Sequence, residues 1–367
     1  MIKKGANFLT DKTVDRVKLI KILENTEQNF SNADTKILEG VIINFKKGDY
    51  SLLSSQEIQF LNLNPSSMFA SYLIFRYKFK KFAALDMIES VAPLHLLIEP
   101  VSSCNLRCTM CFQVDESFSG DQKFMGMMDI KLFKKIIDDA YRNGIKALTL
   151  ASRGEPTLHP KLGEMLEYCT GKFFELKINT NATRLNEKLI HQILQSGVTD
   201  MVFSIDSFEK EEYESIRVLG IFEDVLNNIK KFKAIKDDFY PNSKCSTRVS
   251  GVKVRKTQDI KKFQEFWQKY ADHVVCVEME ERWDTYSNPT SIMGKNPCSY
   301  LWERMYVWFD GTCNPCDIDY KSNLSVGSIV NSDIREIWNS EKFTQLRNMH
   351  KIGERSKFNP CDRCPLW

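Results

Sequence analysis

The sequence predicts an α/β protein with a mostly parallel sheet, a helical segment before it and a cysteine-rich segment after it. From residue 94 onward, short apolar segments alternate with amphipathic segments of helical period, which is typical of βα units. Before that point the apolar residues follow helical spacing only. After residue 282 the alternation ends and cysteines become frequent. The predicted domains are therefore 1–93, 94–282 and 283–367.

The composition is that of an ordinary globular protein and excludes several function classes. Of 367 residues, 43% are hydrophobic and 27% are charged, and the net charge is +3. So small a charge does not favour nucleic-acid binding. No apolar run approaches the roughly 18 residues of a membrane span, and no apolar segment follows the lysines near the N-terminus as in a signal peptide. A cytoplasmic location is expected, where the 11 cysteines indicate metal or redox ligands rather than disulfides.

The first 93 residues are predicted to be mainly helical. Residues 14–23 place apolar side chains at helical spacing, and residues 55–61 begin a second helix. Residues 66–90 contain a long aromatic and basic segment. We interpret it as a packing helix with lysines on its solvated face, while a substrate or partner surface is the alternative.

Six βα units are predicted next. A parallel sheet fits this alternation, but six units are fewer than the eight of a closed TIM barrel. In the first helix one face is apolar, and Asn143-Gly144 provides a stop signal. The strands are expected at 94–99, 147–151, 175–180, 201–205, 246–252 and 274–277. The helices are expected at 129–142, 161–169, 187–196, 222–236 and 260–270.

Three cysteines follow the first of these strands in the pattern C-x3-C-x2-C. Cys104, Cys108 and Cys111 are close enough in sequence to ligate three irons of one [4Fe–4S] cluster. A fourth cysteine is missing from the loop, so one iron would remain open to another ligand. A zinc site is the alternative, although zinc prefers four tetrahedral ligands and no histidine is nearby. Redox-active thiols are a further alternative.

The spacing of these cysteines resembles that of the radical S-adenosylmethionine (radical SAM) superfamily. The resemblance implies an open, partial (β/α)6 TIM-type barrel. It also implies that the open iron binds the amino and carboxylate groups of SAM. An electron from a donor such as flavodoxin or ferredoxin then splits SAM, and the 5′-deoxyadenosyl radical removes a hydrogen atom from the substrate. In such an enzyme the cofactor carries the chemistry, while the protein orients the reactants and excludes water.

Further motifs of this family follow in order at the predicted strand ends. Gly154, Glu155 and Pro156 match its G-G-E-P segment, which contacts the SAM amino group, but Arg153 replaces the first glycine. A carboxylate suits an ammonium group in a dry pocket. Asn179-Thr-Asn-Ala182 is similar to the family's T-N-G, near the ribose. The resemblance assigns cofactor contacts to Met110, Gly154, Glu155, Pro156, Thr180, Asn181, Ser204, Asp206 and Arg217.

A second group of cysteines lies after residue 282. Residues 309–312 are predicted to form a hairpin turn that brings Cys298 near Cys316, and residues 334–347 form a helix leading to Cys361 and Cys364. The pattern resembles the SPASM/twitch extension of radical SAM enzymes and implies one auxiliary [4Fe–4S] cluster on these four cysteines. A four-cysteine zinc site is the alternative. Cys313 lies beside Cys316 but outside the pattern, so its role as an additional ligand stays open.

Taken together, the motifs predict a radical SAM oxidoreductase. A fully ligated auxiliary cluster favours electron transfer, and hence net oxidation of a sugar-like or other small polar metabolite. The first alternative is a maturase or epimerase of a ribosomally made peptide. In an epimerase a lone thiol returns a hydrogen atom, and Cys245 and Cys276 are the candidates, although free buried cysteines are usually structural. The second alternative is a non-catalytic iron–sulfur or zinc scaffold.

Overall fold

The computed structural model describes residues 14–279, 286 and 296–364. The chain divides into two compact units, Met1–Glu89 and Ser90–Trp367. Across the described residues, no helix combines the length and the apolar character needed to cross a membrane.

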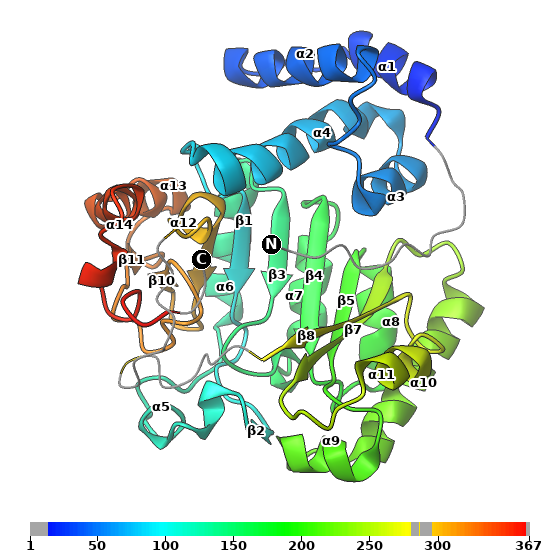
Figure 1. Cartoon of the computed structure of the whole chain (residues 1–367), viewed down its shortest axis with the longest axis vertical. Helices are drawn as coiled ribbons and strands as arrows, with labels where there is room; N and C mark the ends of the chain where they lie inside the picture. The colour runs from blue at the N-terminus through cyan, green and yellow to red at the C-terminus, as the bar shows by residue number, and fades with distance from the viewer. Residues whose placement is uncertain (1–13, 280–285, 287–295, 365–367) are drawn as a thin grey trace. The chain divides into compact units, whose positions relative to one another are not determined.

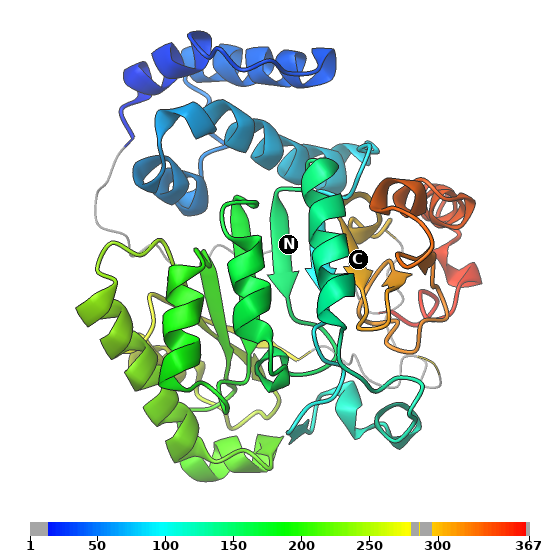
Figure 2. The ribbon, with the colours of Figure 1, turned by 180° about the vertical axis from the view of Figure 1, so that it is seen from behind.

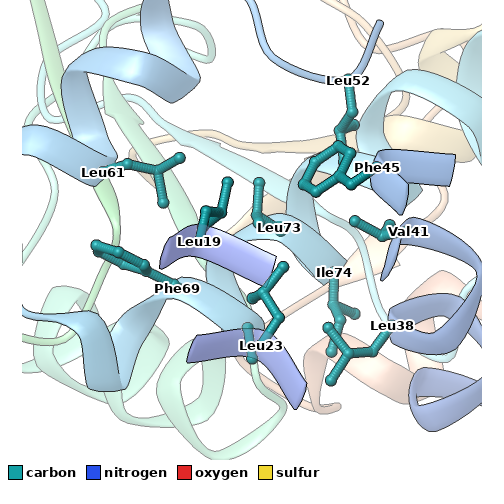
Figure 3. Close-up of a cluster of buried hydrophobic side chains, with 11 residues drawn as sticks. Leu19, Leu23, Leu38, Val41, Phe45, Leu52, Leu61, Phe69, Leu73 and Ile74 are labelled. Atoms are coloured by element: carbon teal, nitrogen blue, oxygen red, sulfur yellow. The ribbon is translucent and has the colours of Figure 1, made fainter. Parts of the chain in front are cut away.

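The first unit is a helical domain with its own apolar core. Its α-helices are α1 (Arg16–Glu24), α2 (Asn32–Lys46), α3 (Ser55–Leu63) and α4 (Phe69–Lys78), with a 3₁₀ turn at Ser66–Met68 and a π-helical turn at Phe79–Asp86. Asp15 and Ser31 accept hydrogen bonds from the first turns of α1 and α2, which fixes where these helices begin. Leucine, valine and phenylalanine side chains from all four helices meet in one cluster (Figure 3). The aromatic residues of α4 mostly pack inward, in agreement with the packing-helix interpretation.

The buried carboxylate of Glu57 joins α3 to α4 and to the π-helical turn that follows α4. Glu57 is fully buried and forms ion pairs with Arg76 at 2.6 Å and with Lys80 at 2.7 Å. Burial alone would raise the pKa of Glu57, but the charge of Arg76 and the hydrogen bond from Lys80 lower it to about 2. The ion pairs therefore stabilise the unit above the ordinary glutamate pKa, and this contribution is lost as the pH falls toward 2.

Glu57→Gln is expected to lower the stability of the first unit by about 3 kcal/mol, because it leaves two cations without their buried counter-charge. Amide hydrogen exchange in α2 and α4 at neutral pH measures this change. Glu24→Gln is the control, since Glu24 pairs with Lys46 at the exposed surface and its loss should cost less than about 1 kcal/mol. Equal protection in the two variants would contradict the assigned role of Glu57.

The second unit is built on a nine-stranded sheet in the order β11-β10-β9-β1-β3-β4-β5-β7-β8. Six of the strands match the predicted ones to within two residues, which confirms the α/β class and the parallel pairing (Figure 1). These strands are β1 (His95–Ile98), β3 (Ala147–Leu150), β4 (Glu175–Thr180), β5 (Asp200–Ser204), β7 (Ser246–Lys253) and β8 (His273–Glu278). β8 and β11 are the two edges, so the sheet is an open barrel.

Amphipathic helices cover the outer face of this sheet (Figure 2). They begin where the sequence predicts and bury their apolar faces; Asp129, for example, caps the first of them by accepting from two backbone amides. These helices are α6 (Ile130–Arg142), α7 (Leu162–Cys169), α8 (Glu187–Gln195), α10 (Phe222–Phe239) and α11 (Ile260–Trp267). All the parallel strands therefore end at the same edge, beyond which β2 (Arg107–Cys108) lies in Figure 1.

The cysteine-rich segment extends the same sheet. β9 (Arg304–Val307) pairs in parallel with β1, and β10 (Thr312–Asn314) and β11 (Gly327–Ser328) continue antiparallel. The turn between β9 and β10 is the predicted hairpin, with Gly311 at a φ of +86°. The helices α12 (Tyr300–Glu303), α13 (Ile334–Trp338) and α14 (Glu341–Lys351) and a 3₁₀ turn at Arg355–Lys357 complete the segment. Because β9 shares a sheet with β1, the segments predicted as separate domains at residue 282 form one compact unit.

Candidate functional site

The loop after β1 carries the three predicted cysteines to the carboxyl edge of the sheet. Its short strand β2 pairs with β6 (Arg217–Val218), with Cys108 opposite Arg217. Two of the sulfurs accept hydrogen bonds from outside the loop: Arg217 Nη1 donates to Cys108 Sγ at 3.9 Å, and Asn181 Nδ2 donates to Cys104 Sγ at 3.8 Å. The backbone amide of Leu106 donates to Cys104 Sγ at 3.4 Å. Such donors stabilise sulfur atoms that carry negative charge.

Burial makes these thiols poor acids until a cation binds. It raises the pKa of Cys104 to about 11 and of Cys111 to about 12, and it also raises that of Cys108. The charge of the Cys108 thiolate adds to the shift at Cys104, and the charges of the Cys104 and Cys108 thiolates add to the shift at Cys111, so the three thiols lie close enough to interact. Metal binding must therefore displace their protons. Three interacting thiols on one loop fit a cluster that leaves one iron open.

The turn after β3 packs directly against the cysteine loop. A Cβ atom on Gly154 would lie 2.3 Å from the carbonyl oxygen of Val101 and 2.4 Å from that of Ser103, so only glycine fits there. Glu155 is buried, and its Oε1 accepts from the backbone amide and hydroxyl of Thr157 and from the hydroxyl of Thr180. Burial raises the pKa of the Glu155 carboxyl group. Pro156 begins the short 3₁₀ turn Pro156–Leu158 that completes the motif.

The end of β4 connects this carboxylate to the cysteines. The backbone amide of Asn181 donates to Glu155 Oε2 at 2.7 Å, and its side-chain amide donates to Asn105 Oδ1 at 3.0 Å as well as to Cys104 Sγ. Thr180 and Asn181 are both buried. The structure thus brings the predicted Gly-Glu-Pro and Thr-Asn motifs together around the first cysteine.

A buried ion pair occupies the other side of the loop. Arg217 Nε donates to Asp206 Oδ2 at 2.7 Å, and the backbone amide of Val252 donates to Asp206 Oδ1 at 2.9 Å. Both members of the pair are buried, so this is not a surface salt bridge. Ser204, at the end of β5, is half-buried, as is Met110 between the second and third cysteines.

An ion pair that was not predicted joins the sheet, the turn after β3 and the cysteine-rich segment. Arg153 Nε and Nη2 donate to the two carboxylate oxygens of Glu99 at 2.7 and 2.6 Å, and Nη1 donates to the carbonyl oxygen of Tyr320 at 3.0 Å. The guanidinium group lies 4.3 Å from the ring centroid of Trp308. The backbone amide of Phe309 also donates to Glu99. The signals available in the sequence were an arginine in place of the motif's glycine and a glutamate ending an apolar strand.

The four predicted cysteines of the C-terminal segment line a common cavity of about 30 Å³. Burial raises the pKa of the thiols of Cys298, Cys316 and Cys361, and neighbouring thiolates add to the shift. Four buried thiols around one space fit an iron–sulfur cluster with every iron ligated. Among the described residues, no three Cys, His, Asp or Glu side chains are placed to hold a single metal ion. The cavity is lined by Cys298, Tyr300, Leu301, Pro315, Cys316, Ile318, Leu324, Leu346, His350, Arg355, Pro360, Cys361 and Cys364.

The remaining candidate cysteines lie apart from both groups. Cys313 is buried in β10, outside the cavity, and its Sγ donates to the carbonyl oxygen of Gly311 at 3.6 Å. Cys245 is buried just before β7, at the opposite edge of the sheet from the cysteine loop. Cys276, on β8, lines a small cavity together with Asp206 and Gln258.

Comparison with protein families gives two matches. Residues 98–266 match the family described as the radical SAM superfamily, and residues 298–365 match the SPASM family, an iron–sulfur cluster-binding domain. The first match contains the cysteine loop, Glu155 and Arg217. The second contains all four cysteines of the cavity.

Curated relatives match over shorter segments. The tungsten-containing aldehyde ferredoxin oxidoreductase cofactor-modifying protein of Pyrococcus furiosus is 38% identical over 114 residues, which are 30% of each chain. The subtilosin biosynthesis protein AlbA of Bacillus subtilis is 28% identical over 39% of this chain and 31% of its own. The mycofactocin maturase MftC of Mycobacterium ulcerans is 26% identical over 39% of this chain and 37% of its own. The matches thus span about a third of these relatives' length.

Solved structures share the fold at low identity. BtrN in complex with AdoMet and 2-DOIA superimposes with a TM-score of 0.51 at 20% identity and covers 76% of this chain and 94% of its own. AdoMet-bound anSMEcpe gives 0.56 at 18% identity, covering 74% and 88%. SuiB of Streptococcus suis bound to its precursor peptide SuiA gives 0.51 at 16% identity, covering 98% and 88%.

The two family matches account for both groups of thiols. The radical SAM domain implies a [4Fe–4S] cluster and S-adenosylmethionine as cofactors, and the SPASM domain implies auxiliary iron–sulfur binding. The chain therefore belongs to the radical SAM superfamily of enzymes and carries a SPASM iron–sulfur domain at residues 298–365.

Proposed function

We propose that this protein is an oxidoreductase in which Cys104, Cys108 and Cys111 hold the SAM-binding [4Fe–4S] cluster. The single observation that carries the proposal is the convergence of three interacting thiols, a buried carboxylate and a buried arginine at the carboxyl edge of the sheet. Active sites of barrels and open α/β sheets lie at this edge. When bound, the cluster and SAM supply a 5′-deoxyadenosyl radical that removes a hydrogen atom from a substrate C–H bond.

The residues around the loop would bind and orient SAM. Glu155 would accept from its ammonium group, because Oε2 has only the Asn181 amide as a hydrogen-bond partner among the described residues and a carboxylate oxygen has two lone pairs. Arg217 donates from Nε to Asp206 and from Nη1 to Cys108 Sγ, and a remaining N–H group would donate to the SAM carboxylate. The proposed set of contacts is Met110, Gly154, Glu155, Pro156, Thr180, Asn181, Ser204, Asp206 and Arg217.

Glu155→Gln is expected to weaken SAM binding at least about tenfold, because a charge-assisted hydrogen bond to the ammonium group becomes a neutral one. Equilibrium dialysis of labelled SAM against anaerobically reconstituted protein measures the dissociation constant. Glu164→Gln, which removes an exposed carboxylate paired with Lys134, is the matched control. Unchanged SAM affinity in Glu155→Gln, at an iron content equal to that of the wild type, would contradict the proposed contact.

The four cysteines of the SPASM cavity would hold one auxiliary [4Fe–4S] cluster, which supplies an electron acceptor near the barrel. Cys316 packs against a group of buried hydrophobic side chains that includes Leu97 of β1. The cavity therefore adjoins the strand that leads into the cysteine loop. We therefore propose a net two-electron oxidation, in which the substrate loses a hydrogen atom and then a proton and an electron. The proposed substrate is a sugar-like or other small polar metabolite, and the proposed electron donor is a flavodoxin or ferredoxin.

Maturation of a ribosomally made peptide is the second candidate. Three similar proteins favour it: AlbA is a bacteriocin biosynthesis protein, MftC is a maturase, and SuiB binds a precursor peptide. A gene for a short precursor peptide beside the gene of this protein would favour maturation, and sugar-nucleotide enzymes would favour metabolite oxidation.

Anaerobic reconstitution followed by iron counting and an assay for 5′-deoxyadenosine tests the proposed function. We expect about eight irons per chain and SAM cleavage that depends on a reductant. Bound zinc without cleavage would support a scaffold instead. Once a substrate is identified, a product of unchanged oxidation state containing hydrogen from solvent would indicate epimerisation and overturn the proposed oxidation.

A further inference from the structure

A buried histidine on α14 faces the cavity of the four cysteines. His350 is 1% exposed and lines this cavity. Its Nδ1 accepts a hydrogen bond from the backbone amide of Cys298 at 3.2 Å. A backbone N–H group can only donate, so Nδ1 carries no proton and the proton of the neutral ring is on Nε2. No sequence motif contains this residue.

The Nε2–H group of His350 lacks a hydrogen-bond partner among the described residues. Its Nε2 atom is buried and makes no hydrogen bond. A buried donor without an acceptor is costly, and native structures rarely leave one unexplained. The cavity is lined mainly by apolar side chains and the four cysteines, and the charged side chain there, Arg355, is itself a donor. The side-chain acceptors in this lining are the four cysteine sulfurs and the Tyr300 hydroxyl, and the sulfurs form the larger set.

We propose that His350 donates a hydrogen bond from Nε2 to a sulfur of the auxiliary cluster or of one of its cysteine ligands, and thereby raises the cluster's reduction potential. The inference rests on the proposed function, since it requires a cluster on Cys298, Cys316, Cys361 and Cys364. Hydrogen bonds to cluster sulfurs stabilise the more negative, reduced state and are a main determinant of the potential. Arg355 adds positive charge at the same wall; its Nη2 donates to the carbonyl oxygen of Cys361. A raised potential suits a cluster that accepts electrons.

Two substitutions separate the roles of the two ring nitrogens, Nδ1 and Nε2. In His350→Asn the amide oxygen can replace Nδ1 as acceptor for the Cys298 amide, while the donor into the cavity is lost. In His350→Gln the side-chain amide reaches the position of Nε2 and restores a donor. Both are made in the full-length chain with Cys104, Cys108 and Cys111 replaced by alanine, so that only the auxiliary cluster contributes to the spectrum. His191→Asn, on α8, controls for the loss of a histidine elsewhere.

The potential is measured by EPR-monitored redox titration, with iron counted in the same samples. His350→Asn is expected to shift the one-electron equilibrium about tenfold toward the oxidised cluster, equivalent to a potential lower by roughly 59 mV. His350→Gln and His191→Asn should stay close to the parent protein. An unchanged potential in His350→Asn at about four irons per chain would overturn the inference and leave the proposed function standing.

Iron content distinguishes the remaining outcomes. Loss of iron from His350→Asn and His350→Gln alike would mean that His350 is a ligand or a structural residue, and this would also overturn the hydrogen-bond role. Absence of iron from the parent triple variant would instead contradict the proposed auxiliary cluster itself.

Discussion

Replacement of Cys104, Cys108 and Cys111 by alanine is expected to abolish SAM cleavage while leaving the rest of the protein loaded with iron. The three thiols interact at the carboxyl edge of the sheet, and the four cysteines of the SPASM domain line a separate cavity. The iron content should fall from about eight to about four per chain, because the auxiliary cluster has its own ligands. Iron counting and chromatography of 5′-deoxyadenosine after anaerobic reconstitution measure both effects.

Cys313→Ala is the matched control for this experiment. Cys313 is buried and belongs to the cysteine-rich segment, but it lies outside the cavity of the other four. We expect its iron content and SAM cleavage to equal those of the wild type. Persistent cleavage in the triple variant, or iron loss in Cys313→Ala, would show that the ligands have been assigned wrongly.

Arg153→Met is expected to destabilise the second unit by about 3–5 kcal/mol, the usual cost of removing one partner of a buried ion pair. The substitution leaves Glu99 buried without its two guanidinium hydrogen bonds and removes the bond to the Tyr320 carbonyl oxygen. Contact between the turn after β3 and the cysteine-rich segment should weaken as a result. Amide hydrogen exchange in β1 and β9 measures the loss of stability.

The double variant Glu99→Gln/Arg153→Met tests whether the charge pair is the cause. It leaves no unpaired buried charge, so it should lose less stability than the two single variants added together. Arg142→Met is the control, because the Arg142 side chain is 72% exposed and its ion pair should contribute less than about 1 kcal/mol. If Arg153→Met is no less stable than Arg142→Met, the pair does not join the two segments.

Local sequence patterns predicted most of the sheet and its helices. The six strands of the barrel are short apolar segments between helices whose apolar residues recur at helical spacing. Such segments can be recognised within a window of a few residues. Capping residues such as Asp129 and Asn186 mark where helices begin. The helix α2 was not among the helices named from the sequence, although Ser31 caps it and residues 1–93 were expected to be mainly helical.

Long-range pairings were not predictable in the same way. The segment after residue 282 was expected to be a separate domain, yet β9 pairs with β1 across more than 200 residues of sequence. The ion pair of Glu99 with Arg153 depends on the same juxtaposition, since Trp308 and Tyr320 complete its surroundings. Neither periodicity nor spacing records which strand lies beside another.

In the candidate site, too, local motifs identified some residues, whereas others were identified only from side-chain contacts in the structure. Motif spacing and family resemblance identified the cysteines and the Gly-Glu-Pro turn, which the structure places together. They did not identify Asn105 or His350, whose importance comes only from the atoms they face. These residues carry no motif of their own, so their roles became visible only with side-chain geometry.

The central claim is that this protein binds two clusters and that only one of them has an open iron. EPR spectra of the reduced, reconstituted wild-type protein, recorded with and without SAM, test it most directly. We predict two [4Fe–4S] signals, of which SAM changes only the one that disappears in the triple cysteine variant. Spectra that SAM leaves unchanged, or a protein that takes up zinc and no iron, would contradict the claim.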